Sequence, residues 1–294
     1  MTDTLDQSVD TAEGRRALHL GWASVLALVV LSGLAVAAGV GVKLLGISWV
    51  AFVAMVSGAV LGKRGSVEHA GGLVWGYGLA SGAMITSAAA FIVPGAIGHH
   101  PAFGGFGIAA GVVTGFAGHT VGHRLAHRDL PLDNTAAAIT AHALTAGLII
   151  GVVYTGMPEL GPLLGLAIVS HKGPAGYAAA RRLVRNGRTP AMLLLPAAAV
   201  GLAALGVALL GPAVQSFLST PLVRALVFGF AAGIFLHVAM DFLPRCEIGS
   251  EVHEVVKTDG DAHEVLDRLR IHAVGSTVLG GAAVFTVWLV LGGA

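Results

Sequence analysis

The chain repeats one ten-residue phrase in two neighbouring apolar segments. The first copy reads AITAHALTAG at 138–147, and the second reads AIVSHKGPAG at 167–176. The copies share Ala, Ile, His, Ala and Gly in register, so each places one imidazole, His142 or His171, in mid-segment. An ionisable residue at membrane depth is costly and by default marks a functional site. Because transporters often build a substrate site between repeated halves, the repeat predicts a polar site shared by two helices.

The composition around this repeat is that of an integral membrane protein. Of the 294 residues, 55% are hydrophobic and 11% are charged, whereas an average soluble domain has about 25% charged residues. The formal net charge of +1 argues against a nucleic-acid partner. The single cysteine, Cys246, excludes an intrachain disulfide. The 43 glycines suit closely packed helices, with Gly-xxx-Gly spacings at Gly78/Gly82, Gly111/Gly115, Gly147/Gly151 and Gly229/Gly233.

Apolar stretches of about 20 residues, long enough to cross a bilayer, predict an all-α integral membrane protein with about nine transmembrane helices. They lie at 20–41, 47–62, 71–94, 104–124, 135–156, 160–182, 190–211, 222–244 and 268–291, of which 47–62 is the weakest. We expect one transmembrane domain at 19–294, with a polar cytoplasmic tail at 1–18 and a cytoplasmic loop at about 246–267. The first apolar run has no convincing cleavage site, so we interpret it as a retained anchor.

The distribution of Lys and Arg predicts the orientation, since these residues concentrate on the cytoplasmic side. With the N-terminus inside, the outer segments keep only Lys43 and Arg224, and the inner segments receive all the other loop cations. Dropping the weak helix at 47–62 would break this segregation. We therefore expect nine helices, a C-terminus outside, and a multi-pass protein of the cell membrane.

Few residues that are charged or ionisable near neutrality lie deep in the spans, and they come from three helices. They are His142, His171, Lys172, His237 and Asp241. Imidazole is the commonest transition-metal ligand, and two imidazoles with one Asp make a nitrogen and oxygen site suited to zinc or its neighbours. His237 and Asp241 are four residues apart and share a helix face. The alternatives are interhelical hydrogen bonds for the histidines and a counter-ion to Lys172, or snorkelling to the interface, for Asp241.

Two further features could contribute to such a site. Pro174 removes a backbone hydrogen bond just after His171 and predicts a helix kink. The freed carbonyl is a candidate cation ligand, and an ordinary packing kink is the alternative.

His119, His123 and His127 repeat every four residues at the inner end of their helix. They form either a metal-handling strip at the inner mouth or a basic interfacial helix end.

The sequence disfavours an enzyme. Metallohydrolase-like His-Glu pairs begin at His253 and His263, but the last position of the H-E-x-x-H pattern is Lys257 or Asp267 instead of His. The chain has no G-x-x-x-x-G-K-[ST] loop for ATP. We therefore expect no catalytic activity and no tightly bound cofactor, and any transport has to be driven by a gradient.

The two phrases resemble the paired His-Asn-x-Pro-Glu-Gly and His-x-x-Pro-Glu-Gly signatures of the Zrt/Irt-like (ZIP) metal transporters. The segment from Phe230 to Pro244 resembles the penultimate helix of that family, and the segment from Leu79 to Pro94 resembles its earlier counterpart. The resemblance covers nearly the whole membrane region and implies an eight-helix bundle with an extra N-terminal helix and internal inverted repeats. The positions that carry over are His142, Gly147, His171, Pro174, Gly176, Asp241 and Pro244.

The chain also departs from the family signatures. The residues at the positions of the family's Asn, Pro and two Glu are Ala143, Thr145, Ala146 and Ala175, and Lys172 stands where many members have a second polar ligand. The family's carboxylates help to form a two-metal site. Two interpretations stay open: Lys172 is a tethered cation that replaces the second metal, or the chain keeps the fold without metal transport.

The resemblance implies a carrier of a divalent transition-metal ion, zinc foremost, moved inward by an elevator or rocking motion. In that interpretation His142, His171 and Asp241 are metal ligands, His237 is a relay, and Lys172 excludes a second ion. The expected partners are the metal ion as transported substrate and the lipid bilayer, and a homodimer is an open alternative to a monomer. The other hypothesis is a transporter-like protein without metal flux, either a sensor or a carrier of an anionic solute.

Overall fold

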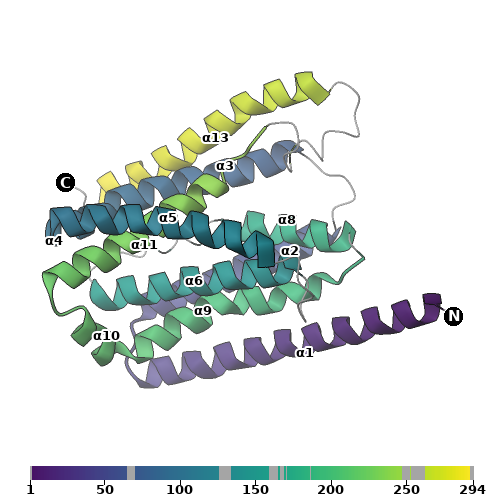
Figure 1. The fold of residues 1–294 in the computed structure, drawn as a ribbon, viewed down its shortest axis with the longest axis horizontal. Helices are drawn as coiled ribbons and strands as arrows, with labels where there is room; N and C mark the ends of the chain where they lie inside the picture. The colour runs from purple at the N-terminus through teal and green to yellow at the C-terminus, as the bar shows by residue number, and fades with distance from the viewer. Residues whose placement is uncertain are drawn as a thin grey trace. The chain divides into compact units, whose positions relative to one another are not determined.

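The structure, a computed structural model, describes residues 2–64, 70–125, 134–158, 165, 169, 171–185, 187–246, 252 and 262–291. The secondary structure of these residues is helical, and no β-strand occurs among them, as the sequence predicts. Most of the helices in Figure 1 are long rods, as spans of a bilayer require.

Eight helical segments of the described chain are long and apolar enough to cross a membrane. They are Gly14–Ala37, Val42–Arg64, Ala70–His99, Pro101–Gly118, Ile139–Gly156, Pro190–Leu209, Pro221–Asp241 and Glu264–Val290. Each overlaps one expected span, including the weak one at 47–62. The ninth expected span, 160–182, includes residues outside the described part, and its second half contributes to helix α8 (Lys172–Arg185). The protein is an all-α, multi-pass membrane protein.

The chain divides into two compact units, each built from three separate stretches of sequence. The first unit comprises Met1–Arg64, His119–Glu159 and Ala175–Ser216, and the second comprises Gly65–Gly118, Leu160–Pro174 and Phe217–Ala294. The polar tail at 1–18 belongs to the first unit, where it continues the first membrane helix, α1 (Thr2–Ala37), toward the N-terminus. The expectation of one transmembrane domain stays a prediction, and within the chain two packing units can be distinguished.

In the first unit, α9 (Leu194–Leu209) packs against α1, α2 (Val42–Arg64) and α6 (Asn134–Gly156). Small side chains allow this, since van der Waals packing of small residues drives helix association in lipid. A Cβ at Gly147 of α6 would collide with the carbonyl oxygen of Val200 in α9. Figure 1 shows α6 and α9 running side by side.

Two helical segments begin with the same local signal, Thr followed by Pro. Thr189 precedes the 3₁₀ turn η2 (Pro190–Leu193) that leads into α9, and its hydroxyl accepts a hydrogen bond from the Ala191 N–H at 3.3 Å. Thr220 caps α11 (Pro221–Asp241) in the same way. The Thr oxygen satisfies an N–H that the helix itself cannot, and Pro at the first helical position needs no such partner.

In the second unit, α3 (Ala70–Ser87) packs along α13 (Ala262–Leu291). Gly78 and Gly82 of α3 lie against the backbone and small side chains of α13, so a side chain at either position would collide with its neighbour. The helices α5 (Pro101–Leu125) and α11 approach each other through glycines in the same way. The glycines of this pair are Gly107, Gly111, Gly229 and Gly233.

Helix α3 continues through a π-helical turn, η1 (Ala88–Ile92), into α4 (Val93–His99). The N–H of Val93 donates to the carbonyl of Ala88, five residues back, which widens the turn just before Pro94. A π turn accommodates one additional residue within a helix. The stretch from Gly82 to Pro94 is indeed one residue longer than the similar stretch from Gly233 to Pro244 in α11.

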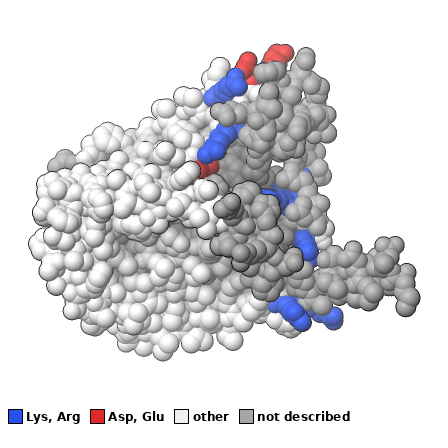
Figure 2. Space-filling model, in the orientation of Figure 1, with Lys and Arg blue, Asp and Glu red and all other residues white. Residues whose placement is uncertain are grey.

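Large apolar side chains point outward along the helices of both units. Phe106 is 65% exposed and Ile271 is 76% exposed, with Leu26, Val53 and Phe116 also more than half exposed. In Figure 2 most of the described atoms are white, and the Lys and Arg atoms are confined to a small part of the face shown. Apolar surface on this scale is unusual for a soluble monomer and matches contact with lipid chains.

Candidate polar site

His171 and Lys172 are buried in the second unit, with 0% and 1% of their surfaces exposed. The Lys172 Nζ has no hydrogen-bond partner among the described residues. Burying an ammonium group without a compensating partner is strongly unfavourable. A buried polar atom of this kind calls for an explanation other than stability, which makes Lys172 a candidate functional residue.

Among the described residues around this pair, helical structure is interrupted at His171. Val169 is helical, His171 lies in a turn, and α8 begins again at Lys172. Pro174 therefore lies in the first turn of α8, where a missing N–H costs no helical hydrogen bond. The kink expected at Pro174 stays a prediction, and the described interruption lies three residues earlier, at His171.

Aromatic and apolar contacts hold this turn in place. The rings of His171 and Phe242 have centroids 4.9 Å apart, and Phe242 in turn lies 5.5 Å from Tyr77 of α3. A Cβ at Gly76 of α3 would come 3.3 Å from the Cγ of Pro174. Helix α3 and the residue that follows α11 thus position the break.

A second polar group lies on α11. The Nε2 of His237 is 3.2 Å from Oδ2 of Asp241, and Oδ1 of Asp241 is 3.5 Å from the Nη2 of Arg245. His237 is mostly buried, and the Asp241 side chain is 31% exposed. Asp241 therefore pairs with His237 and Arg245 and is not the counter-ion of Lys172.

The imidazole of His237 fills the space beside a glycine of α5. A Cβ at Gly115 would lie 2.5 Å from the Cδ2 of His237. Gly115 is the second glycine of the Gly111/Gly115 pair. Its missing side chain makes room for the histidine, so the pair combines close helix packing with placement of a polar group.

The structure assigns the predicted site residues to different units. His142 is half-buried on α6 in the first unit, and His171, His237 and Asp241 belong to the second. The pairing of the two signature histidines stays a prediction. No three His, Cys, Asp or Glu side chains form a metal-binding group within the part of the chain that the structure describes.

Most of the histidine strip predicted at the inner end of α5 lies outside the part of the chain that the structure describes. His119 and His123 fall within the bounds of α5, but the contacts of their side chains are outside the described part, and His127 lies outside the described residues altogether. The choice between a metal-handling strip and a basic interfacial helix end stays open.

Three residues that shape the two polar groups were not predicted from the sequence. Arg245 carried a detectable signal, because it lies four residues after Asp241 and pairs at that spacing are common on helices. The role of Gly115 beside His237 depends on another helix, and Phe242 looks like any other apolar residue. Neither could be assigned from local sequence.

Comparison of the chain with protein-family models and with curated protein sequences finds no match.

Proposed function

We propose that the protein is a secondary transporter of a divalent transition-metal ion, with zinc the best-fitting substrate, and that it is a divergent ZIP-type carrier of the cell membrane. The observation that carries the proposal is the helix break at His171, where a buried imidazole and a buried lysine adjoin an interruption of the helix. Discontinuous helices near mid-membrane, with polar groups at the break, are typical of substrate sites in secondary transporters.

The division into two interleaved units supports a transport cycle. Alternating access requires one group of helices to move against another. Close packing of the helices within each group lets that group move as a rigid body. Each unit here has its own glycine-mediated packing, α6 on α9 in one and α3 on α13 in the other.

In this proposal the residues act in distinct roles. His142 and His171 coordinate the ion through imidazole nitrogens. Asp241 supplies the negative charge, either as a ligand or as an exit station. His237 lies against Asp241 at 3.2 Å and passes the ion or a proton along α11. Lys172 places a positive charge beside the site, which leaves room for one ion and repels a second.

A second candidate is a carrier of an anionic solute, favoured by Lys172 alone. The amine is fully buried and has no hydrogen-bond partner among the described residues, as expected of a group that binds a negatively charged substrate. A divalent cation next to this amine would be repelled. The two candidates therefore predict opposite effects when the lysine charge is removed.

The experiment that tests the proposal is the flux of radioactive zinc into proteoliposomes that contain the purified protein. We expect flux above empty liposomes, abolished in the His142→Ala/His171→Ala double variant. His19→Ala is the matched control, since His19 lies on the exposed face of α1 and should leave flux unchanged.

The Lys172→Met variant separates the two candidates. For a cation carrier, removal of the charge tightens zinc binding, whereas for an anion carrier it abolishes transport of the anion and gives no zinc flux. Zinc flux that persists in the double histidine variant would show that the site is assigned to the wrong residues. A folded protein without zinc flux would favour the anion carrier.

A further inference from the structure

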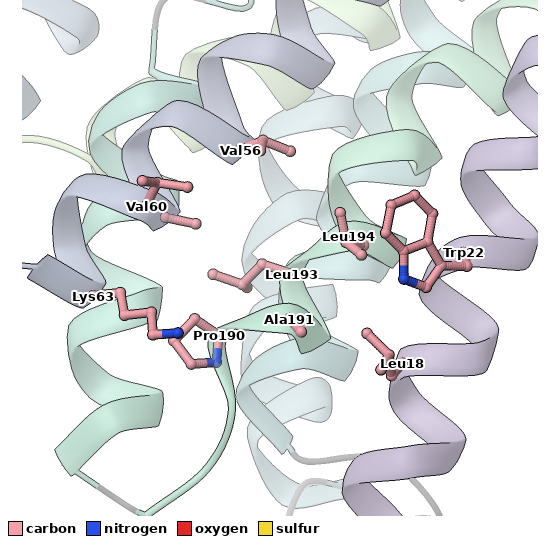
Figure 3. Close-up of a pocket in the computed structure, with 10 residues that line it drawn as sticks. Leu18, Trp22, Val56, Val60, Lys63, Pro190, Ala191, Leu193 and Leu194 are labelled. Atoms are coloured by element: carbon pink, nitrogen blue, oxygen red, sulfur yellow. The ribbon is translucent and has the colours of Figure 1, made fainter.

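The first unit contains a groove, separate from the polar groups above, between α1, α2 and η2. It encloses about 250 Å³ and is lined by Leu18 and Trp22 of α1, by Val56 and Val60 of α2, and by residues at the start of α9 (Figure 3). The groove opens outward, because Trp22 is 60% exposed and Val60 is 41% exposed. Its volume is below the roughly 300–1,000 Å³ typical of small-molecule pockets, so it suits part of a long, thin ligand.

On α1 the apolar residues that line the groove are followed, one turn toward the N-terminus, by a basic residue. Trp22 and Leu18 are four residues apart, and Arg15 lies three residues before Leu18. Residues at these spacings share one helix face. The wall is therefore apolar along the groove and positively charged one turn beyond it.

On α2 the same arrangement runs in the opposite chain direction. Val56 and Val60 are four residues apart, and Lys63 follows three residues after Val60. Lys63 itself lines the groove, and Figure 3 shows its side chain reaching toward Pro190 of η2. Helices α1 and α2 are joined by only residues 38–41, so they run antiparallel. Their basic residues consequently lie at the same end.

The charges at this end are available to a ligand. Arg15 and Lys63 are both exposed, and neither forms an ion pair with a residue that the structure describes. The groove lining contains no His, Cys, Asp or Glu, so it offers nothing to a metal ion. The complementary ligand has a negatively charged head and an apolar tail.

We propose that this groove binds one anionic phospholipid of the surrounding membrane. An acyl chain lies along Leu18, Val56 and Val60, and the phosphate sits between Lys63 and Arg15. Trp22 flanks the chain with an amphipathic ring of the kind enriched at membrane interfaces. The concentration of Lys and Arg on the cytoplasmic side of membrane proteins assigns this lipid to the cytoplasmic leaflet.

The test uses quenching of Trp22 fluorescence by phospholipids with brominated acyl chains. The full-length protein is reconstituted in phosphatidylcholine, and brominated phosphatidylglycerol or brominated phosphatidylcholine is titrated in. The Trp22→Phe variant supplies the background of the other tryptophans, and its subtraction isolates the signal of the groove. We expect half-maximal quenching at a several-fold lower mole fraction for the anionic lipid.

The basic residues are tested by Lys63→Gln and Arg15→Gln. Each should weaken binding of the anionic lipid about fivefold, which corresponds to ~1 kcal/mol per basic residue near the surface. Quenching by phosphatidylcholine should stay unchanged. Arg16→Gln removes the same charge from α1, but Arg16 lies two residues before Leu18 and six before Trp22, so it does not share the helix face that Arg15 shares with them. This variant should stay within about twofold of the wild type.

Occupation of the groove itself is tested by Val60→Phe, which fills it from its exposed wall and should reduce Trp22 quenching by both lipids. Equal half-maximal mole fractions for the two lipids in the wild type would overturn the proposal. So would an effect of Arg16→Gln as large as that of Arg15→Gln, since the attraction would then be a general property of the basic end.

Discussion

The two copies of the repeated phrase share five residues but differ in chemistry. The residue after the histidine is Ala143 in the first copy and Lys172 in the second, and these are 0% and 1% exposed. The final glycines, Gly147 and Gly176, are also both buried, and each faces a backbone carbonyl oxygen of a neighbouring helix. The repeat thus preserves two steric positions while placing a methyl group at one and an ammonium group at the other.

The histidines themselves differ in environment. His142 is half-buried within a continuous helix, whereas His171 is fully buried at a helix break. Thr145 in the first copy lies within α6, where its hydroxyl donates to the Ala141 carbonyl at 3.0 Å, and Pro174 stands at the same place in the second copy. A shared phrase therefore does not ensure a shared environment, because the two histidines lie in different backbone surroundings.

The largest effect should come from giving the first copy the lysine of the second. Ala143→Lys buries a charge in a site built for a methyl group, and an uncompensated buried charge costs about 3–5 kcal/mol. Thermal unfolding in detergent should show a large loss of stability. Ala143→Met is the control for side-chain bulk. If both variants lose the same stability, the charge is not the cause.

The two glycines should be nearly as sensitive. Gly147→Val and Gly176→Val each push a side chain into a backbone carbonyl, of Val200 and Met55 respectively, and overpacking of this kind costs about 1–3 kcal/mol or more. The measurement is again the thermal midpoint. In Gly206→Val the new Cβ meets nothing within 4 Å, so this helix position should tolerate the change; a loss there as large as at Gly147 would refute the explanation.

A smaller effect of opposite sign is expected at Lys172. Lys172→Met keeps the length of the side chain and removes the buried charge, and removal of a buried charge without a described partner should be neutral or modestly stabilising. The thermal midpoint should therefore stay the same or rise, in contrast to Ala143→Lys. A clear loss of stability would mean that Lys172 has a compensating anionic partner in the folded protein.

The smallest expected difference concerns chemical access to the histidines. Diethyl pyrocarbonate should modify the half-buried His142 several-fold faster than the fully buried His171. Peptide mapping by mass spectrometry follows both sites in one sample, and the exposed His19 sets the upper rate. Faster modification at His171 would show that the helix break is open to reagent.

Much of the membrane architecture could be predicted from the sequence. Eight of the nine expected spans coincide with described membrane-length helices, because hydropathy over about 20 residues is a local property. The Gly-xxx-Gly pairs also lie at close helix contacts, since only small residues allow such approach. The division into two units was not predicted, because it depends on contacts between stretches far apart in the chain.

The polar residues could be found in the sequence, but their partners could not. His171, His237 and Asp241 stand out as ionisable groups in apolar helices. That Asp241 pairs with His237 and Arg245 instead of Lys172 depends on helix rotation and backbone path. Helical spacing predicts the pairs within α11, whereas a contact between α11 and another helix has no local signal.

The sequence by itself determined that the chain is helical, crosses a membrane several times, and carries few ionisable groups in its spans. Local hydropathy decides these properties, since an apolar helix has one favourable environment. Only the tertiary structure decided that Lys172 is buried without a described partner, that the helix breaks at His171, and that His237 lies beside Gly115. These depend on which helices approach each other, and that choice minimises the packing energy of the whole bundle.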